Sequence, residues 1–190
     1  MKVIDLVTKS RSYRRFDQSV QIPEQELKEC IEAARRAPSG ANLQPLRFHL
    51  TTEKPEADNL FPLLKWAGYL SDWDGPEEGE RPTAYVTVLR DIEVKDVASK
   101  TDAGIAMQTI MLSAVEKGYG GCIFASINRK EWARLIGVDD RYEILFVMAL
   151  GSPVEEVKLE DAADKDDIKY YRDENQVHHV PKRRVSDLLV

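Results

Sequence analysis

The chain has 190 residues, with 27 Lys and Arg against 33 Asp and Glu and a formal net charge of −6 at pH 7. Its length is that of one domain of about 100–200 residues. A composition of 43% apolar and 32% charged residues fits a soluble globular protein and excludes a disordered chain. The acidic balance argues against a nucleic acid as the main partner, because that role needs a basic surface.

No apolar run approaches the ~18 residues that span a bilayer. The first ten residues carry Lys2, Asp5 and Lys9, which is unlike a secretory signal. The two cysteines, Cys30 and Cys122, stand in apolar surroundings, which is typical of buried thiols in a reducing compartment. We therefore expect a cytoplasmic protein with no membrane partner.

Apolar spacing predicts helices and strands in the first half of the chain: helices over residues 3–9 and 23–37, a weaker helix over 55–70, and strands over 48–52 and 84–89. Pro23 suits a helix start, and Pro38-Ser39-Gly40 ends that helix. Residues 71–82 are acidic and rich in turn residues, so we expect a mobile surface loop or a lid there.

The second half is predicted in the same way: a helix over 101–117, a strand over 122–125, a helix over 128–137 and a strand over 144–150. The helix over 101–117 is apolar almost all round, so we expect it to be central and buried on most sides. Asn128, with Glu131 three residues on, forms a capping box, and Gly137 closes that helix.

The chain after residue 153 is expected to be acidic and irregular: short extended pieces around 168–171 and 177–180, a basic turn over 181–184 and one helical turn. It has too few apolar residues for a core of its own, so it should wrap its own domain or a partner subunit. Helices and strands are mixed without a regular βαβ alternation, which predicts an α+β fold. We expect a core over residues 1–153 and an extension of the same domain over 154–190.

The common nucleotide-binding, hydrolase and metal motifs are absent from the sequence. Of the three histidines, His178 and His179 are adjacent and diverge on a strand, while His49 stands alone. A metal site needs a tighter cluster, so no metal is expected.

Two basic clusters lie near opposite ends of the chain. The first contains Arg11, Ser12, Arg14 and Arg15, and the second runs over residues 182–184. Guanidinium groups match the geometry of a phosphate, and a serine hydroxyl adds a hydrogen bond. A solvated basic turn is the commoner meaning of either cluster alone.

A third segment, over residues 38–45 (PSGANLQP), is rigid and rich in turns. It offers backbone N–H groups, two amides and a hydroxyl, which can line a planar polar heterocycle. Alone, it also has the composition of an ordinary connection from a helix to a strand.

Together, these segments are more specific. RSYRRF at 11–16, PSGANLQPLRF at 38–48, a buried helix leading to GGCIFAS at 120–126, and a basic tail resemble the nitroreductase family of FMN-dependent oxidoreductases. The resemblance covers residues 3 to about 153, and the tail matches loosely. It implies an α+β homodimer with a mostly antiparallel sheet flanked by helices and a C-terminal arm that wraps the partner subunit.

The resemblance also implies two FMN molecules at the dimer interface. One subunit would line the flavin with Arg11, Ser12 and Arg14, and the other would reach it with Pro38, Ser39, Gly40 and Asn42. In this arrangement Arg11 holds the phosphate, Arg14 approaches the N1–O2 edge of the ring, Ala125 and Ser126 lie beside N5, and Lys182 and Arg184 close on the phosphate. Where the family often has a further Arg, this chain has Ser10, which places more of the phosphate binding on the C-terminal basic residues.

The implied reaction is a two-step hydride transfer from NADH or NADPH, through flavin N5, to an oxidised acceptor such as a nitroaromatic or a quinone. The cofactor carries this chemistry, so we nominate no protein general base. Trp66, Tyr69 and Trp73 are candidates for gating the acceptor or for a core aromatic cluster. The open alternatives are other flavin chemistry on the same scaffold, such as dehalogenation or dehydrogenation, and a flavin-binding or sensing protein without robust turnover. A third alternative, disfavoured by the acidic charge balance, is an adaptor that binds an anion or a nucleic acid through RSYRR at 11–15.

Overall fold

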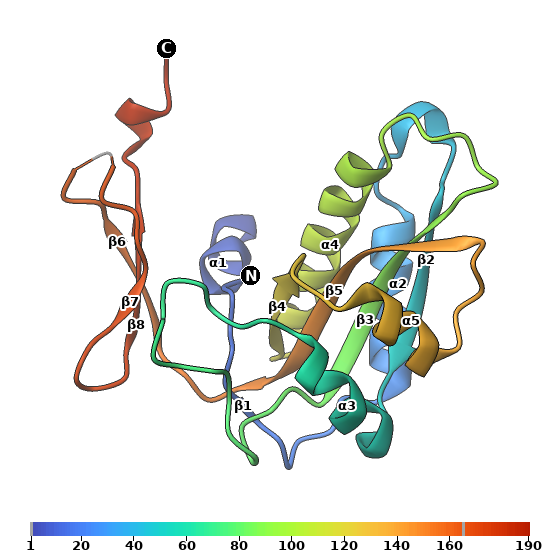
Figure 1. Ribbon diagram of the computed structural model, residues 1–190. Coiled ribbons are helices and arrows are strands. Elements are labelled where there is room, and N and C mark those ends of the chain that lie inside the picture. Colours follow the sequence, from blue (N-terminus) through green and yellow to red (C-terminus); the bar gives the residue numbers. More distant parts are fainter. Residues whose placement is uncertain (1, 165) are drawn as a thin grey trace.

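A computed structural model describes residues 2–164 and 166–190, and a five-stranded antiparallel sheet lies at its centre (Figure 1). Its strands are β1 (Phe16–Asp17), β2 (Leu46–Thr51), β3 (Ala84–Asp91), β4 (Gly120–Phe124) and β5 (Tyr142–Pro153). β3 pairs with β5 and β2 pairs with β3, while β4 and the short β1 also pair with β5. The sheet confirms the predicted α+β class, and the two-residue β1 is a strand that the sequence did not predict.

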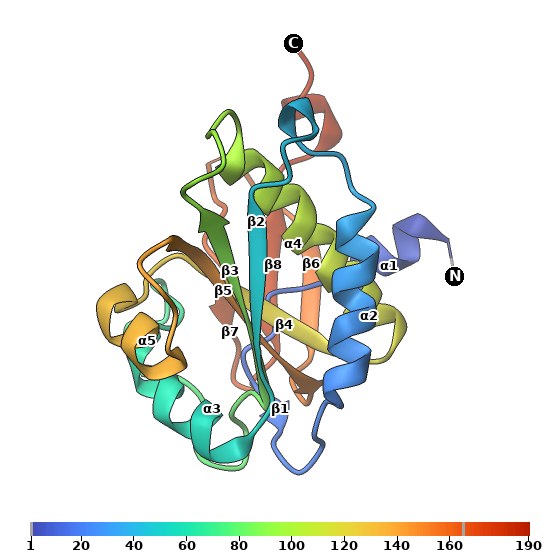
Figure 2. The same cartoon turned by 90° about the vertical axis from the view of Figure 1, so that its right-hand side faces the viewer.

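Helices cover both faces of the sheet (Figure 2). α2 (Glu24–Arg35) and α4 (Ser99–Glu116) cover one face, while α3 (Lys54–Leu60) and α5 (Arg129–Ile136) cover the other. Each face has its own apolar cluster, because β3 and β5 are buried on both sides and their residues point alternately to the two faces. α1 (Val3–Lys9) lies beside α4 near the N-terminus.

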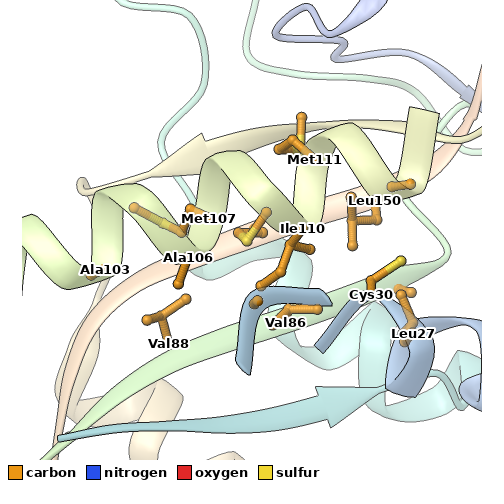
Figure 3. Packing of buried hydrophobic residues seen from close by; sticks show 14 of the residues in the cluster. Leu27, Cys30, Val86, Val88, Ala103, Ala106, Met107, Ile110, Met111 and Leu150 are labelled. Carbon is orange, nitrogen blue, oxygen red and sulfur yellow. The ribbon is translucent and has the colours of Figure 1, made fainter. Parts of the chain in front are cut away.

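α4 makes the largest contribution to the first cluster. Figure 3 shows its buried side chains above Leu27 and Cys30 of α2 and above Val86 and Val88 of β3: Ala103, Ala106, Met107, Ile110 and Met111. The opposite stripe of α4, with Gly104, Ile105 and Gln108, is exposed. The expectation that this helix is buried on most sides is therefore wrong for the single chain, although its bounds and central place were predicted.

α5 begins and ends where the sequence predicts, with half of the predicted capping box. The Asn128 side chain accepts a hydrogen bond from the amide of Glu131, whereas the Glu131 carboxylate bonds to Arg134. Gly137 ends the helix in the left-handed region at φ 65°. This glycine is needed because a side chain at that φ would be strained.

The segment after residue 153 is more regular than its composition indicates. β6 (Val157–Asp161) pairs in parallel with β8 (His178–Lys182), and β7 (Tyr171–Arg172) pairs with β8 in antiparallel fashion. β6 contradicts the prediction of an irregular chain here. The basic turn predicted over residues 181–184 is wrong for Pro181 and Lys182, which belong to β8. We call this small sheet the arm; it stands beside α1, away from the helices of the core (Figure 1).

The turn-rich residues 71–82 are attached to the body of the protein. The Glu80 carbonyl accepts from the amide of Phe16 at 2.9 Å, and the Glu80 carboxylate forms a bidentate ion pair with Arg15 at 2.6 Å. Trp73 lies under the guanidinium of Arg172 in β7. These contacts join the segment to both β1 and the arm.

Candidate functional site

A cavity of about 350 Å³ opens where the N-terminal segment, α4, β4 and the arm meet. Most of its polar lining comes from two segments distant in the sequence, and Gln108 of α4 adds an amide. Residues 10–14 contribute Ser10, Arg11, Ser12 and Arg14, and the arm contributes Tyr170, His178 and Lys182. Two of the predicted groups, the early arginines and Lys182, are therefore brought together within one chain.

The charge of this cavity is one-sided. Arg11, Arg14 and Lys182 line it, and its described lining includes no Asp or Glu, although the chain as a whole carries −6. Burial lowers the pKa of Arg11 from its usual value, and the buried Nε of this side chain has no hydrogen-bond partner among the described residues. Such a lining suits an anionic ligand with several acceptor atoms.

Glycine lets the arginine segment lie against the sheet. Ser12 forms a bridge with Gly121 of β4, and the amide of Tyr13 donates to the Gly121 carbonyl at 3.0 Å. A Cβ on Gly120 would collide with the ring of Tyr13, and one on Gly121 would collide with the Ala149 carbonyl. The glycine pair is thus the local reason why residues 10–14 reach the cavity.

Arg14 is held from several sides and is only 7% exposed. Its Nη1 donates to the Ser12 carbonyl at 3.1 Å and lies 3.2 Å from Nε2 of His178. Its guanidinium lies over the ring of Tyr170, 4.9 Å from the centroid. The arm therefore fixes the orientation of this arginine.

Glu155 ties the arm to the same segment. Its buried carboxylate accepts a hydrogen bond from the Arg14 amide and another from Arg172 of β7 at 3.1 Å. Glu155, Tyr170 and His178 were not among the predicted site residues. Glu155 lies in a stretch expected to be irregular, and Tyr170 and His178 lie in predicted extended pieces to which no role in the site was assigned. The chemistry of their side chains offers one clue. A carboxylate, a phenol and an imidazole are costly to bury without partners, so each needs a hydrogen bond or an ion pair where the fold buries it.

The pKa of His178 is lowered to about 4. Burial is the first cause, since the side chain is only 1% exposed, and the charges of Arg14, Arg172 and His179 add to it. The ring is therefore neutral at pH 7.

The predicted residues from 38–42 lie elsewhere. Pro38 and Ser39 line a separate groove of about 390 Å³ between α2 and β2. Asn42 is exposed in the 3₁₀ turn Gly40–Asn42. The single chain does not bring this group to the cavity that Arg14 lines.

The loop over residues 40–44 has a strained backbone. Ala41, Asn42 and Gln44 have φ of 50°, 54° and 50°, a region that favours glycine. Such strain persists where the surroundings hold it in place. Here Asp102, in the first turn of α4, accepts hydrogen bonds from both Ser39 and Gly40.

The remaining predicted site residues lie outside the cavity lining of the single chain. Ala125 and Ser126 are exposed beyond the end of β4, and the Ser126 carbonyl accepts from the Lys65 amide at 3.2 Å. Arg184 is exposed ahead of the 3₁₀ turn Val185–Asp187, with Nε 4.0 Å from a carboxylate oxygen of Asp161.

Neither a metal centre nor a bilayer span emerges from the described part of the chain. Across residues 2–164 and 166–190, His, Cys, Asp and Glu side chains form no group of three that could hold a metal ion. Among the same residues, every helix is too short or too polar to cross a membrane.

Comparison with known proteins gives a consistent result. The model of the Nitroreductase family matches residues 7–152. A relative from Bacillus subtilis (strain 168), provisionally named NAD(P)H nitroreductase YdgI, is 25% identical over an alignment of 187 residues that covers 80% of this chain and 89% of the relative.

Solved structures share the fold. An FMN-dependent nitroreductase from Clostridium difficile R20291 superposes with a TM-score of 0.69 at 24% identity, covering 86% of this chain and 95% of that one. A protein from Exiguobacterium sibiricum 255-15, solved in complex with FMN, gives a TM-score of 0.67 at 20% identity and covers 82% and 90% of the two chains. The match of the family model over residues 7–152, on this antiparallel sheet, shows that the chain belongs to the Nitroreductase family.

Proposed function

We propose that this protein is an FMN-dependent oxidoreductase that passes a hydride from NADH or NADPH to an oxidised organic acceptor such as a nitroaromatic or a quinone. The observation that carries the proposal is the cavity of about 350 Å³, whose lining, among the described residues, holds Arg11, Arg14 and Lys182 and no carboxylate. A phosphorylated, electron-accepting ring needs this distribution of charge, because both its phosphate and its reduced form are anionic.

The residues present fit FMN. Arg11, Ser12 and Lys182 all line the cavity and bring two positive charges and several hydrogen-bond donors to it. We assign Arg11 and Lys182 to the phosphate, with Arg184 joining them, and Ser12 and Arg14 to the polar edge of the ring. Membership in the Nitroreductase family and the FMN complex of a structural neighbour support the same ligand.

The proposed active form is a homodimer. Pro38, Ser39, Gly40 and Asn42 belong to the site by resemblance, and they lie away from the arginine-lined cavity of their own chain. A second copy of the chain would bring its loop over residues 38–42 to this cavity. Two exposed apolar features support such an interface: the groove between α2 and β2, and the C-terminal side chains Val185, Leu188, Leu189 and Val190.

Bound FMN supplies hydride acceptance and donation at N5, in two successive half-reactions. The chain's own residues bind and orient the ring, and Arg14 places a fixed positive charge where reduction adds negative charge. Backbone N–H groups at Ala125 and Ser126 are assigned to the N5 side. The protein needs no general base for this reaction.

The absorption spectrum of the purified protein is the deciding experiment. We expect the bands of a bound oxidised flavin, and oxidation of NADH or NADPH when an acceptor is added. A colourless protein that also fails to bind added FMN would refute the proposal.

A panel of acceptors then separates the flavin chemistries that this fold carries. One structural neighbour, CLA-ER, is an enone reductase with a TM-score of 0.66. The panel should therefore hold a nitroaromatic, a quinone, an enone and a halogenated phenol. Bound FMN with no turnover of any acceptor would assign a binding or sensing role instead.

A further inference from the structure

We propose that His178 is a positioning residue of the site: as a neutral imidazole it accepts a hydrogen bond from Arg14 through Nε2 and so fixes the guanidinium that faces the bound ligand. The inference rests on the proposed function and adds to it a residue from the arm of the same chain.

The first step is the direction of the hydrogen bond. Nη1 of Arg14 lies 3.2 Å from Nε2 of His178, and both side chains are buried. A guanidinium is a donor only, so Nε2 must be the unprotonated acceptor. The proton of the neutral ring is then on Nδ1.

The second step is the environment of the other ring nitrogen. Nδ1 of His178 is buried, has no hydrogen-bond partner among the described residues and exposes almost no surface to the cavity. The imidazole therefore acts on a bound ligand through Nε2 and the guanidinium of Arg14, which lines the cavity.

The third step is the charge around the ring. Arg14 approaches from the N-terminal segment, Arg172 is the cross-strand neighbour on β7, and His179 is adjacent on β8. The carboxylate of Glu155, which joins the same two arginines, is bonded to the Arg14 amide and to the Arg172 side chain. Protonating His178 would put a third charge beside two arginines and would remove the acceptor that holds Arg14, so ligand binding should weaken in acid.

Tyr170 completes this arrangement. Its ring lies 4.9 Å from the Arg14 guanidinium and 5.2 Å from the imidazole of His178. The tyrosine therefore limits the movement of both partners and makes their hydrogen bond specific.

The first test needs no flavin. In ¹⁵N NMR of the imidazoles of the full chain, His178 should carry its proton on Nδ1 and should stay neutral at pH 5.5, where an ordinary histidine is about nine-tenths protonated. A proton on Nε2, or titration near pH 6.5, would overturn the inference. This outcome decides the positioning of Arg14 even if the wild-type protein binds no FMN, which would instead defeat the proposed function.

The second test measures FMN affinity by quenching of flavin fluorescence. His178→Phe should weaken binding about tenfold or more, while His178→Gln, which keeps an acceptor and a donor, should stay within about threefold of wild type. His179→Gln is the matched control, because its neighbouring imidazole bonds to Glu160 and Asp173 instead of Arg14. Wild-type affinity in His178→Phe would refute the role.

The pH profile separates positioning from packing. Between pH 5 and pH 3.5, a range that spans the lowered pKa of His178 of about 4, FMN affinity should fall more steeply in the wild type than in His178→Gln, since only the wild type loses its acceptor by protonation. Parallel profiles would contradict the proposed role of the neutral imidazole.

Discussion

The hydroxyl of Ser39 donates to Oδ2 of Asp102 at 2.8 Å, which links a loop before β2 to the first turn of α4. The same carboxylate accepts from the Gly40 amide at 2.9 Å and is 5% exposed. Asp102 therefore uses both oxygens to hold the strained segment that the proposed dimer presents to the flavin. A carboxylate in the first turn of a helix is also favoured by the helix dipole.

Asp102→Asn should release this loop. Asparagine keeps one acceptor oxygen and replaces the other by a donor, so one of the two hydrogen bonds is lost and the donor of Ser39 or Gly40 is unsatisfied. We expect a loss of about 1–3 kcal/mol in the free energy of unfolding, measured by urea denaturation, and weaker FMN binding. Glu116→Gln, at the exposed end of the same helix, should change neither; an equal loss in both variants would show that the loop contact is not the cause.

Arg14 and Arg15 are neighbours with separate contacts, and this permits a matched test. Arg14 lines the cavity, whereas Arg15 forms its ion pair with Glu80. Arg14→Gln should raise the Kd for FMN at least about tenfold, which corresponds to ~1.4 kcal/mol, and should make the bound flavin harder to reduce. Arg15→Gln should lower stability while leaving the reduction potential of the bound flavin unchanged. The proposed role of Arg14 would be wrong if its variant kept the wild-type flavin content and potential.

Local patterns predicted the core elements well because the signals lie within each element. The near-continuous apolar run over residues 144–150 and the cap Asn128 both specify structure without distant contacts. β1 was not predictable, because two residues carry no period and their pairing depends on Ser152 and Pro153 at the far end of β5. β6 was missed for a similar reason: its charged residues mask the alternation, and its pairing with β8 joins segments about twenty residues apart.

Of the candidate site, only the residues whose positive charge is visible in the sequence could be predicted. The early arginines and Lys182 were identified as cations, and one cavity contains them. The buried partners of Arg14 could not be found in the same way, since Glu155 and His178 become buried only when the arm packs on the N-terminal segment. Asp102 was not predicted either. In the sequence it stands among the apolar residues of α4, and the hydroxyl that it binds, that of Ser39, belongs to a loop about sixty residues earlier.

The arm should have a pH-dependent stability that His179 controls. Its Nδ1 lies 3.0 Å from a carboxylate oxygen of Glu160, and its Nε2 lies 3.1 Å from a carboxylate oxygen of Asp173. Both hydrogen bonds raise the pKa of the imidazole. A raised pKa in the folded state gives stability that is fully present below the unfolded pKa of about 6.5 and is lost as the pH rises through the folded pKa. His179→Gln should therefore lower the free energy of unfolding more at pH 6 than at pH 9.

Urea denaturation of the two proteins at both pH values measures this difference. His49→Gln on β2 is the control, because Nδ1 of His49 has no partner among the described residues. A stability loss in His179→Gln that is the same at both pH values would show that the two carboxylates are not the cause.

Gly120, at the start of β4, permits a steric test of how this strand packs against the arginine segment. A Cβ on Gly120 would collide with the ring of Tyr13 and with Pro153, whereas a Cβ on Gly104, in the exposed stripe of α4, would meet no atom within 4 Å. Gly120→Ala should cost about 1–3 kcal/mol of unfolding free energy and should lower FMN affinity, because the displaced Tyr13 adjoins Ser12 and Arg14. Gly104→Ala should instead stabilise the protein by up to about 1 kcal/mol, since alanine favours the helix. If Gly120→Ala retained both wild-type stability and FMN binding, close packing of β4 against the arginine segment would not be what shapes the cavity.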